Sequence, residues 1–180
     1  MTDELMRSHK DIEKLQPYLH LPVQSGSDRV LKEMNRGYTF ADYMKIIDKT
    51  REYRPDIAVS GDFIVGFPGE TDKDFQDTLD LVDSVGFDES FSFIYSPRPN
   101  TTAKDLEDNV PLEQKKLRLD ELQLKLENSA LSISRRMVGQ VTRCLVTGVS
   151  KKDPGEFQAR RFSGQTSVRP EDCLARRLPD

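Results

Sequence analysis

The first two thirds of the chain alternate short apolar runs with stretches in which apolar residues recur at helical spacing. Runs of the first kind favour strands and stretches of the second kind favour helices. Strands are expected within residues 18–27, 56–67 and 90–96, and helices at 28–34, 39–53 and 71–86. Strands that alternate with helices imply crossover connections and a parallel sheet, so the expected fold class is α/β.

Helix boundaries are marked by capping residues. Thr39 with Asp42, and Thr71 with Asp74, have the three-residue spacing of a capping box. Gly86 is placed to end the second of these helices. Three β-α units match the repeat of a β/α barrel but are too few to close one, so we expect an arc of barrel.

The sequence changes character after this arc. Pro111 is expected to open a long helix through Met137, with a leucine stripe at Leu117, Leu122, Leu124, Leu126 and Leu131 and a supporting Glu121–Lys125 pair. From Gly139, β-prone runs separated by Gly, Lys-Lys and Asp-Pro-Gly predict two strands of a small β-module. The expected domains are therefore residues 1–137 and 138–180.

Charge divides the chain in a similar place. Residues 135–180 contain 10 Lys/Arg and 5 Asp/Glu, whereas the other 134 residues contain 17 and 26. An acidic body with a basic end suggests two parts with different partners, or an uneven solvated surface. With 36% hydrophobic and 32% charged residues and a polar start, the chain is expected to be cytoplasmic, with no membrane partner.

Candidate chemistry gathers where the predicted strands end, in "PVQSGS", "VGFPGE" and "YSPRP". Ligands bind at the carboxyl ends of parallel strands, and glycines such as Gly66 allow close approach of the backbone. Asp62 is expected to face inward or be paired, because burying it alone is costly. His20 is expected to be a core residue and His9 lies in a polar leader, so no catalytic residue and no metal ligand is assigned.

Four blocks carry a resemblance to a known family: "LHLPVQSGSDRVLKEMNRGYT", "DFIVGFPGETDKDFQDTLDLV", "FDESFSFIYSPRPNTTA" and "VSKKDPG". They resemble the bacterial tRNA methylthiotransferases, which are radical S-adenosylmethionine enzymes that methylthiolate N6-isopentenyladenosine at position 37 of tRNA. The resemblance covers about Tyr18 to Gly155. It implies the last three strands of a radical SAM barrel, a long helix and a TRAM-like RNA-binding module.

The resemblance also implies roles for matching residues. Gln24 and Ser25 would face the ribose and methionine part of S-adenosylmethionine. The adenosyl group would lie against the next two strand ends, at Asp62, Ile64, Gly66, Tyr95 and Ser96. Phosphates of tRNA would be held by Arg143, Lys151 and Lys152.

The sequence departs from the family at important points. The C-x-x-x-C-x-x-C loop that holds a [4Fe-4S] cluster is absent, and the two cysteines, Cys144 and Cys173, are far apart. We therefore expect a C-terminal fragment that is inactive alone, with the N-terminal half of the enzyme as a possible partner. The loop "RPNTTA" replaces "RPGTPA", and the pattern beyond Gln158 suggests an incomplete RNA-binding module.

Two other functions remain open. The chain could belong to the sister family that methylthiolates an aspartate of a ribosomal protein, although "HLPVQSGS" and "SPRP" favour the tRNA branch. It could also be a non-catalytic RNA-binding remnant, in which the arc only supports the tail. Either way, an arc of three strands leaves unpaired edges that favour aggregation or a binding partner.

Overall fold

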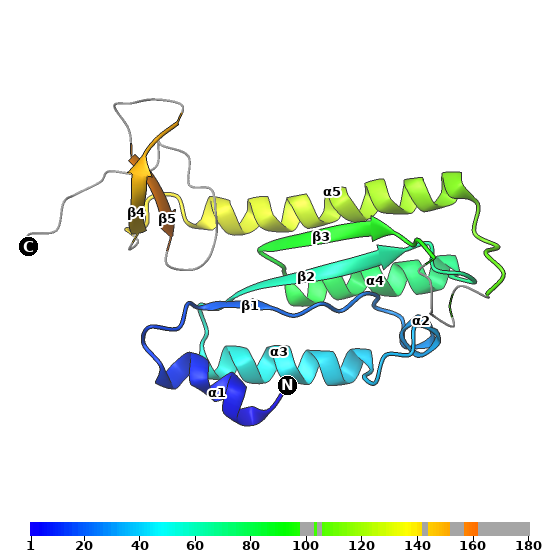
Figure 1. The fold of residues 1–180 in the computed structure, drawn as a ribbon, viewed down its shortest axis with the longest axis horizontal. Helices are drawn as coiled ribbons and strands as arrows, with labels where there is room; N and C mark the ends of the chain where they lie inside the picture. Colours follow the sequence, from blue (N-terminus) through cyan, green and yellow to red (C-terminus); the bar gives the residue numbers. More distant parts are fainter. Residues whose placement is uncertain (98–102, 104–105, 142–143, 152–156, 162–180) are drawn as a thin grey trace, which may run out of the picture.

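A computed structural model describes residues 1–97, 103, 106–141, 144–151 and 157–161 (Figure 1). A three-stranded sheet with its helices is followed by a long helix and a two-stranded hairpin. The elements are α1 (Asp3–Asp11), β1 (Tyr18–His20), α2 (Asp28–Glu33), α3 (Phe40–Tyr53), β2 (Ala58–Val65), α4 (Asp72–Val85), β3 (Glu89–Ile94), α5 (Leu112–Arg136), β4 (Cys144–Val149) and β5 (Phe157–Arg161).

The first sheet is parallel in the order β1-β2-β3, which confirms the predicted α/β class. Tyr18 pairs with Ala58 across β1 and β2, and Ser60 pairs with Glu89 across β2 and β3. β1 is shorter than expected and is continued by one isolated bridge from Gln24 to Phe63. The Leu21 amide donates to the Ser60 carbonyl and the Gln24 amide to the Asp62 carbonyl, so the β1 segment has one extra residue between these bonds, which accounts for the interruption.

The predicted helix caps are confirmed. Thr39 with Asp42 and Thr71 with Asp74 each form both hydrogen bonds of a capping box. Gly86 ends α4 with φ of 64°, a left-handed conformation that glycine adopts without a steric cost. The polar start of the chain, in contrast, is helix α1, capped by Thr2, and it was not predicted.

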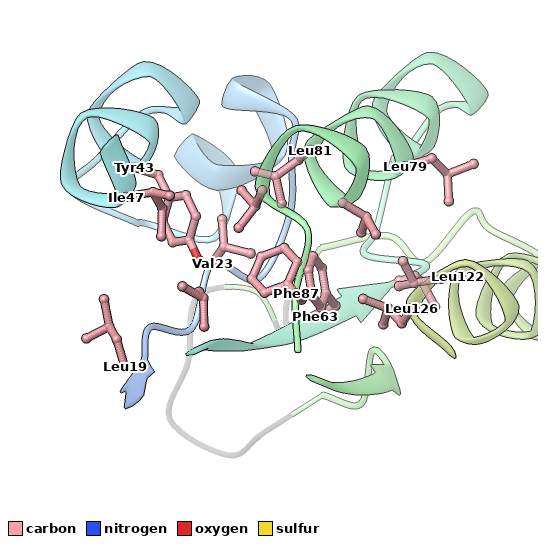
Figure 2. Packing of buried hydrophobic residues seen from close by; sticks show 14 of the residues in the cluster. Leu19, Val23, Tyr43, Ile47, Phe63, Leu79, Leu81, Phe87, Leu122 and Leu126 are labelled. Carbon is pink, nitrogen blue, oxygen red and sulfur yellow. The ribbon is translucent and has the colours of Figure 1, made fainter. Parts of the chain in front are cut away.

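The core lies between the sheet and helices α3, α4 and α5 (Figure 2). Side chains alternate along β2, so Phe63 and Val65 point into this core while Asp62 and Ile64 are only half-buried. Phe63 meets Phe87 edge to face, with ring centroids 5.2 Å apart. The opposite side of the sheet, which we call the uncovered face, carries Tyr18, His20, Ser60, Asp62, Ile64, Phe91 and Phe93.

Helix α5 follows the sheet through part of its predicted leucine stripe. Leu122 and Leu126 are buried in the core, whereas Leu117, Leu124 and Leu131 are exposed. Lys125 pairs with Asp83 of α4 at 2.7 Å rather than with the predicted Glu121. Lys125 therefore links two helices instead of supporting one.

The predicted pair of strands after α5 is confirmed as the antiparallel hairpin β4–β5, which has a bulge between Val146 and Gly148. Apolar side chains of this hairpin stay exposed, among them Leu145, Val149 and Phe157. The domain boundary expected after residue 137 falls between α5 and β4, and the division into two domains stays a prediction. Among the described residues, no helix combines the length and hydropathy needed to cross a bilayer.

Candidate functional site

The carboxyl ends of the three parallel strands meet at one edge of the sheet. The amide of Gln24 donates to the carbonyl of Asp62, and the amide of Ile64 donates to the carbonyl of Gln24, both at 2.8 Å. On the other side of β2, the amide of Tyr95 donates to the carbonyl of Val65 at 2.8 Å. These backbone bonds bring the predicted binding segments side by side, and we call this the carboxyl edge.

The segment after β1 is held from behind by α4. Gln24 has φ of 74°, which is uncommon for a residue other than glycine. Ser25 is fully buried, and its hydroxyl lies 3.3 Å from the Thr78 hydroxyl of α4. A Cβ on Gly26 would lie 2.2 Å from the carbonyl oxygen of Asp77, so only glycine fits there. The geometry gives Ser25 a partner within the protein, and its role toward a ligand stays a prediction.

Asp74 gathers the polar groups of this region. Its carboxylate accepts from Ser27 Oγ at 2.6 Å, from the Thr71 amide at 2.8 Å and from the guanidinium of Arg29. Burial disfavours the charged form of Asp74, but hydrogen bonds from Arg29, Ser27 and Thr71 outweigh burial and hold the pKa well below its usual range. The carboxylate therefore stays ionised and ties the first helical turn to the segment after β1.

The uncovered face carries a polar cluster beside the predicted Asp62. His20 Nδ1 lies 2.7 Å from Ser60 Oγ, which is also 2.6 Å from the Tyr18 hydroxyl. His20 Nε2 lies 3.5 Å from Asp62, whose side chain is 28% exposed. Asp62, which was expected to face inward or be paired, lies half-buried beside His20. The expectation of a core His20 is wrong, because its side chain is 41% exposed on the uncovered face.

The segment after β2 is held by α5 through a buried ion pair. The Gly66 amide donates to Glu70 Oε2 at 2.8 Å, and Arg118 Nη1 donates to the same oxygen at 2.9 Å. Arg118 also donates to the Glu70 carbonyl at 3.1 Å and to Asp72 Oδ1 at 2.7 Å. Burial raises the pKa of Glu70 despite the bonds from Gly66 and Arg118.

The end of β3 has its own supports. Tyr95 packs edge to face on Phe67 at 5.0 Å, and its hydroxyl donates to the Ala103 carbonyl at 2.9 Å. Burial raises the pKa of Tyr95. The ammonium of Lys115 lies 5.8 Å from the Tyr95 ring and pairs with Asp108 at 2.6 Å. Ser96, the last predicted residue of this edge, is exposed.

Sequence reasoning missed Glu70, Lys115 and Arg118. Glu70 ends the segment "VGFPGE" and both cations lie in the predicted long helix, but no role was predicted for any of the three. Their spacing of three residues places Lys115 and Arg118 on one side of α5. That spacing was the available signal, although it does not say what the side faces.

The sequence resemblance implies two cofactors, S-adenosylmethionine and an iron–sulfur cluster, and the described residues fit them differently. The carboxyl edge offers half-buried, apolar Ile64 and the polar end of β1, which fits an adenosyl compound. The expected open approach at Gly66 is wrong, because Gly66 is buried and Lys115 fills the place of its Cβ. An iron–sulfur cluster does not fit the described residues, because no group of three His, Cys, Asp or Glu side chains comes together among them. Cys144 is a free, exposed thiol on β4.

The predicted RNA contacts are only partly within the described residues. Lys151 is exposed just after β4. Arg143 and Lys152 lie outside the described residues. Their role toward RNA stays a prediction.

Comparisons with known proteins agree with the fold. Residues 1–82 match the radical SAM superfamily. The chain is 57% identical over 159 residues to the tRNA-2-methylthio-N(6)-dimethylallyladenosine synthase of Hahella chejuensis, 55% to that of Nitrosomonas eutropha and 54% to that of Neisseria meningitidis serogroup A. Each alignment covers 88% of this chain and 36% of the relative, so the chain spans about a third of the length of these relatives.

Proposed function

We propose that the chain is part of a radical SAM methylthiotransferase and that it forms one wall of an S-adenosylmethionine site used to methylthiolate N6-isopentenyladenosine at position 37 of tRNA. The observation that carries this proposal is the carboxyl edge. Three adjacent strand ends lie there, joined by backbone hydrogen bonds, where parallel folds bind ligands. The identity of 54–57% to the named synthases supports the choice of reaction.

Each part of the edge suits one part of the cofactor. Ile64 would offer an apolar side chain to the adenosyl group, with the strand ends at Gly66, Tyr95 and Ser96 beside it. Gln24, with its positive φ, presents a backbone shape fixed by the fold to the ribose and methionine part. Asp62 beside His20 supplies a hydrogen-bonding group on the same face.

In this family the bound cofactor and a [4Fe-4S] cluster supply the radical chemistry. The described residues do not provide ligands for that cluster. The cluster-binding part is therefore proposed to be a separate partner, or a further part of a longer polypeptide. The uncovered face and the free edge of β1 are the surfaces that such a part would complete.

The second proposed partner is tRNA, bound in the cytoplasm by the basic region around β4 and β5. Support comes from the excess of 10 Lys/Arg over 5 Asp/Glu in residues 135–180 and from the exposure of Lys151. Contacts to phosphates release counterions, so affinity for tRNA should fall as salt rises. Affinity that does not change with salt would argue against phosphate contacts.

The test uses isotope-labelled chain and S-adenosylhomocysteine, a stable analogue of the cofactor. We expect amide resonances of Gln24, Ile64, Gly66 and Tyr95 to shift together with one dissociation constant, while those of α1 stay in place. Shifts scattered over the molecule, or none at millimolar ligand, would contradict the proposed site.

A genetic test addresses the reaction. Deleting the gene should remove 2-methylthio-N6-isopentenyladenosine from total tRNA, as measured by mass spectrometry of nucleosides. Unchanged tRNA together with loss of a methylthio-aspartate from a ribosomal protein would favour the sister family. Unchanged levels of both, with salt-dependent tRNA binding, would favour the non-catalytic RNA-binding function.

A further inference from the structure

Two buried cations of α5 lie directly behind the carboxyl edge. Lys115 and Arg118 are only 4% and 5% exposed, although long cations rarely lose contact with water. They come from a helix that begins 46 residues after Gly66, and both reach the same short segment between β2 and α4. Such placement needs an explanation beyond surface charge.

Arg118 fixes the segment between β2 and α4 by bonding both the side-chain carboxylate and the backbone carbonyl of Glu70. One guanidinium nitrogen bonds both Glu70 Oε2 and the Glu70 carbonyl, and the other bonds Asp72. The same Oε2 accepts from the Gly66 amide, so a single oxygen joins Arg118 to the end of β2. Atoms Oε1 of Glu70 and Nε of Arg118 are buried without a hydrogen-bond partner among the described residues.

The two unbonded atoms indicate that the Glu70–Arg118 pair does more than stabilise the fold. A buried ion pair offsets its loss of hydration only when its remaining polar atoms are also bonded. Here each partner leaves one polar atom unbonded, yet the bonds to backbone groups at Gly66 and Glu70 are well formed. The Glu70–Arg118 pair therefore serves to fix the backbone at Gly66 and Glu70 more than to stabilise the fold.

Lys115 fixes the same segment by packing. A Cβ on Gly66 would lie 2.4 Å from Lys115 Cγ, so the lysine stem fills the space behind Gly66. Gly66 has φ of 70°, a left-handed conformation that the stem and the Glu70 bond hold from one side. The ammonium continues to Asp108 and lies 5.8 Å from the ring of Tyr95, so one side chain touches the ends of both β2 and β3.

We propose that Lys115 and Arg118 are positioning residues for the cofactor site: they set the backbone of Gly66 and the ring of Tyr95 from behind, without touching the ligand. The inference rests on the proposed function of the carboxyl edge. It adds that α5, the helix that leads to the β4–β5 hairpin, determines the shape of that edge. Ligand binding and the attachment of α5 are then coupled.

Variants of Lys115 separate the stem from the charge. Lys115→Met keeps the stem behind Gly66 and removes the ammonium, whereas Lys115→Ala removes both. In unliganded chain, we expect hydrogen exchange of the Gly66 amide to rise about tenfold in Lys115→Ala and to stay within about twofold of the parent in Lys115→Met. The matched control is Lys125→Met. Lys125 lies further along α5, and the substitution breaks its ion pair with Asp83 of α4.

Variants of Arg118 test whether its guanidinium must bond Glu70 and Asp72 at the same time. Arg118→Lys keeps the charge beside Glu70 but cannot bond Glu70 and Asp72 together. Because loss of the charge could unfold the chain, the second variant is the pair Glu70→Gln with Arg118→Met, which leaves no uncompensated buried charge. Both should raise Gly66 exchange, and Arg118→Lys should raise it less.

Affinity for S-adenosylhomocysteine is the second readout. We expect it to fall about tenfold in Lys115→Ala and to change less than about twofold in Lys115→Met and Lys125→Met. A merely structural role would instead lower affinity in proportion to global stability, as followed by urea unfolding. Equal affinities in Lys115→Ala and Lys125→Met would overturn the inference.

The two readouts also separate this inference from the proposed function. If the parent chain does not bind the analogue but Gly66 exchange follows the predicted order, the positioning role stands and the cofactor assignment fails. If the analogue binds and Gly66 exchange is the same in all variants, the cofactor site stands and the positioning role fails.

Discussion

Glu70, just before α4, and Asp74, in the first turn of α4, are four residues apart in the chain, yet their surroundings shift their pKa values in opposite directions. Both are buried, and burial disfavours the charge of each. Asp74 is surrounded by donors from Ser27, Arg29 and Thr71, whereas one oxygen of Glu70 has no partner among the described residues. At Asp74 the hydrogen-bond donors outweigh burial and favour the ionised form, whereas at Glu70 burial outweighs the donors and disfavours it.

The comparison also separates two ways of holding a strand end. The Asp74 cluster ties the segment after β1 to the first turn of α4, close to solvent at Arg29. The Glu70 cluster ties the segment after β2 to α5, away from solvent at Arg118. We therefore expect the second cluster to be more sensitive to the loss of one partner.

The largest effect is expected from Arg118→Met. Removing one partner of a buried pair leaves Glu70 as an uncompensated charge, and the free energy of unfolding should fall by about 3–5 kcal/mol. Urea unfolding followed by circular dichroism measures the change. The double variant Glu70→Gln with Arg118→Met should recover most of the loss. A double variant as unstable as the single one would show that packing, not charge, accounts for the effect.

A smaller effect is expected from Asp74→Ala. The variant removes the capping-box carboxylate and its charged hydrogen bonds, and Arg29 can regain water because its side chain is 49% exposed. We expect a loss of about 2–3 kcal/mol in the free energy of unfolding, measured in the same way. A loss larger than that of Arg118→Met would reverse the comparison between the two clusters.

Opposite pKa shifts predict opposite dependence on pH. The lowered pKa of Asp74 gives stability that is full above the ordinary pKa of aspartate and is lost as pH falls. The raised pKa of Glu70 gives a contribution that is full below the ordinary pKa of glutamate and is lost as pH rises.

Between about pH 5 and pH 3, stability should therefore fall less steeply in Asp74→Asn and more steeply in Glu70→Gln than in the parent chain. Urea unfolding at several pH values gives these slopes. Identical slopes in the two variants would mean that neither carboxylate titrates as its surroundings predict.

The smallest effect is expected from Lys125→Met on the same helix as Arg118. Its ion pair with Asp83 is partly exposed, so the loss should be about 0–1 kcal/mol. The thermal midpoint, read by circular dichroism, is the measurement. A loss comparable to that of Arg118→Met would indicate that any break between α4 and α5 is equally harmful.

Local signals in the sequence predicted the elements well. Both capping boxes, Gly86 and the strand at β2 depend on residues that are neighbours along the chain, and all are confirmed. Helix α1 was missed because Leu5 and Met6 are its only apolar residues, although Met6 and His9 are buried three residues apart. Propensity and capping decide such a helix more than periodicity does.

Long-range arrangements were predicted less well. The carboxyl edge could be expected because parallel strands end on one side of a sheet. The Glu70–Arg118 pair joins residues 48 apart, and nothing local marks it. The buried part of α5 lies at Leu122 and Leu126 rather than along the whole leucine stripe, because only one side of the helix meets the sheet.

Arg118 lies in the second turn of α5, a 25-residue helix whose other end leads to β4. The 18 residues after Arg118, up to Arg136, extend for about 27 Å in a straight helix, so a tilt of about 5° at Arg118 displaces the hairpin end by about 2.4 Å. Arg118 thus acts as the pivot about which the rest of α5 tilts. Small adjustments of a guanidinium group would be magnified into movements comparable to the separation of hydrogen-bonded atoms.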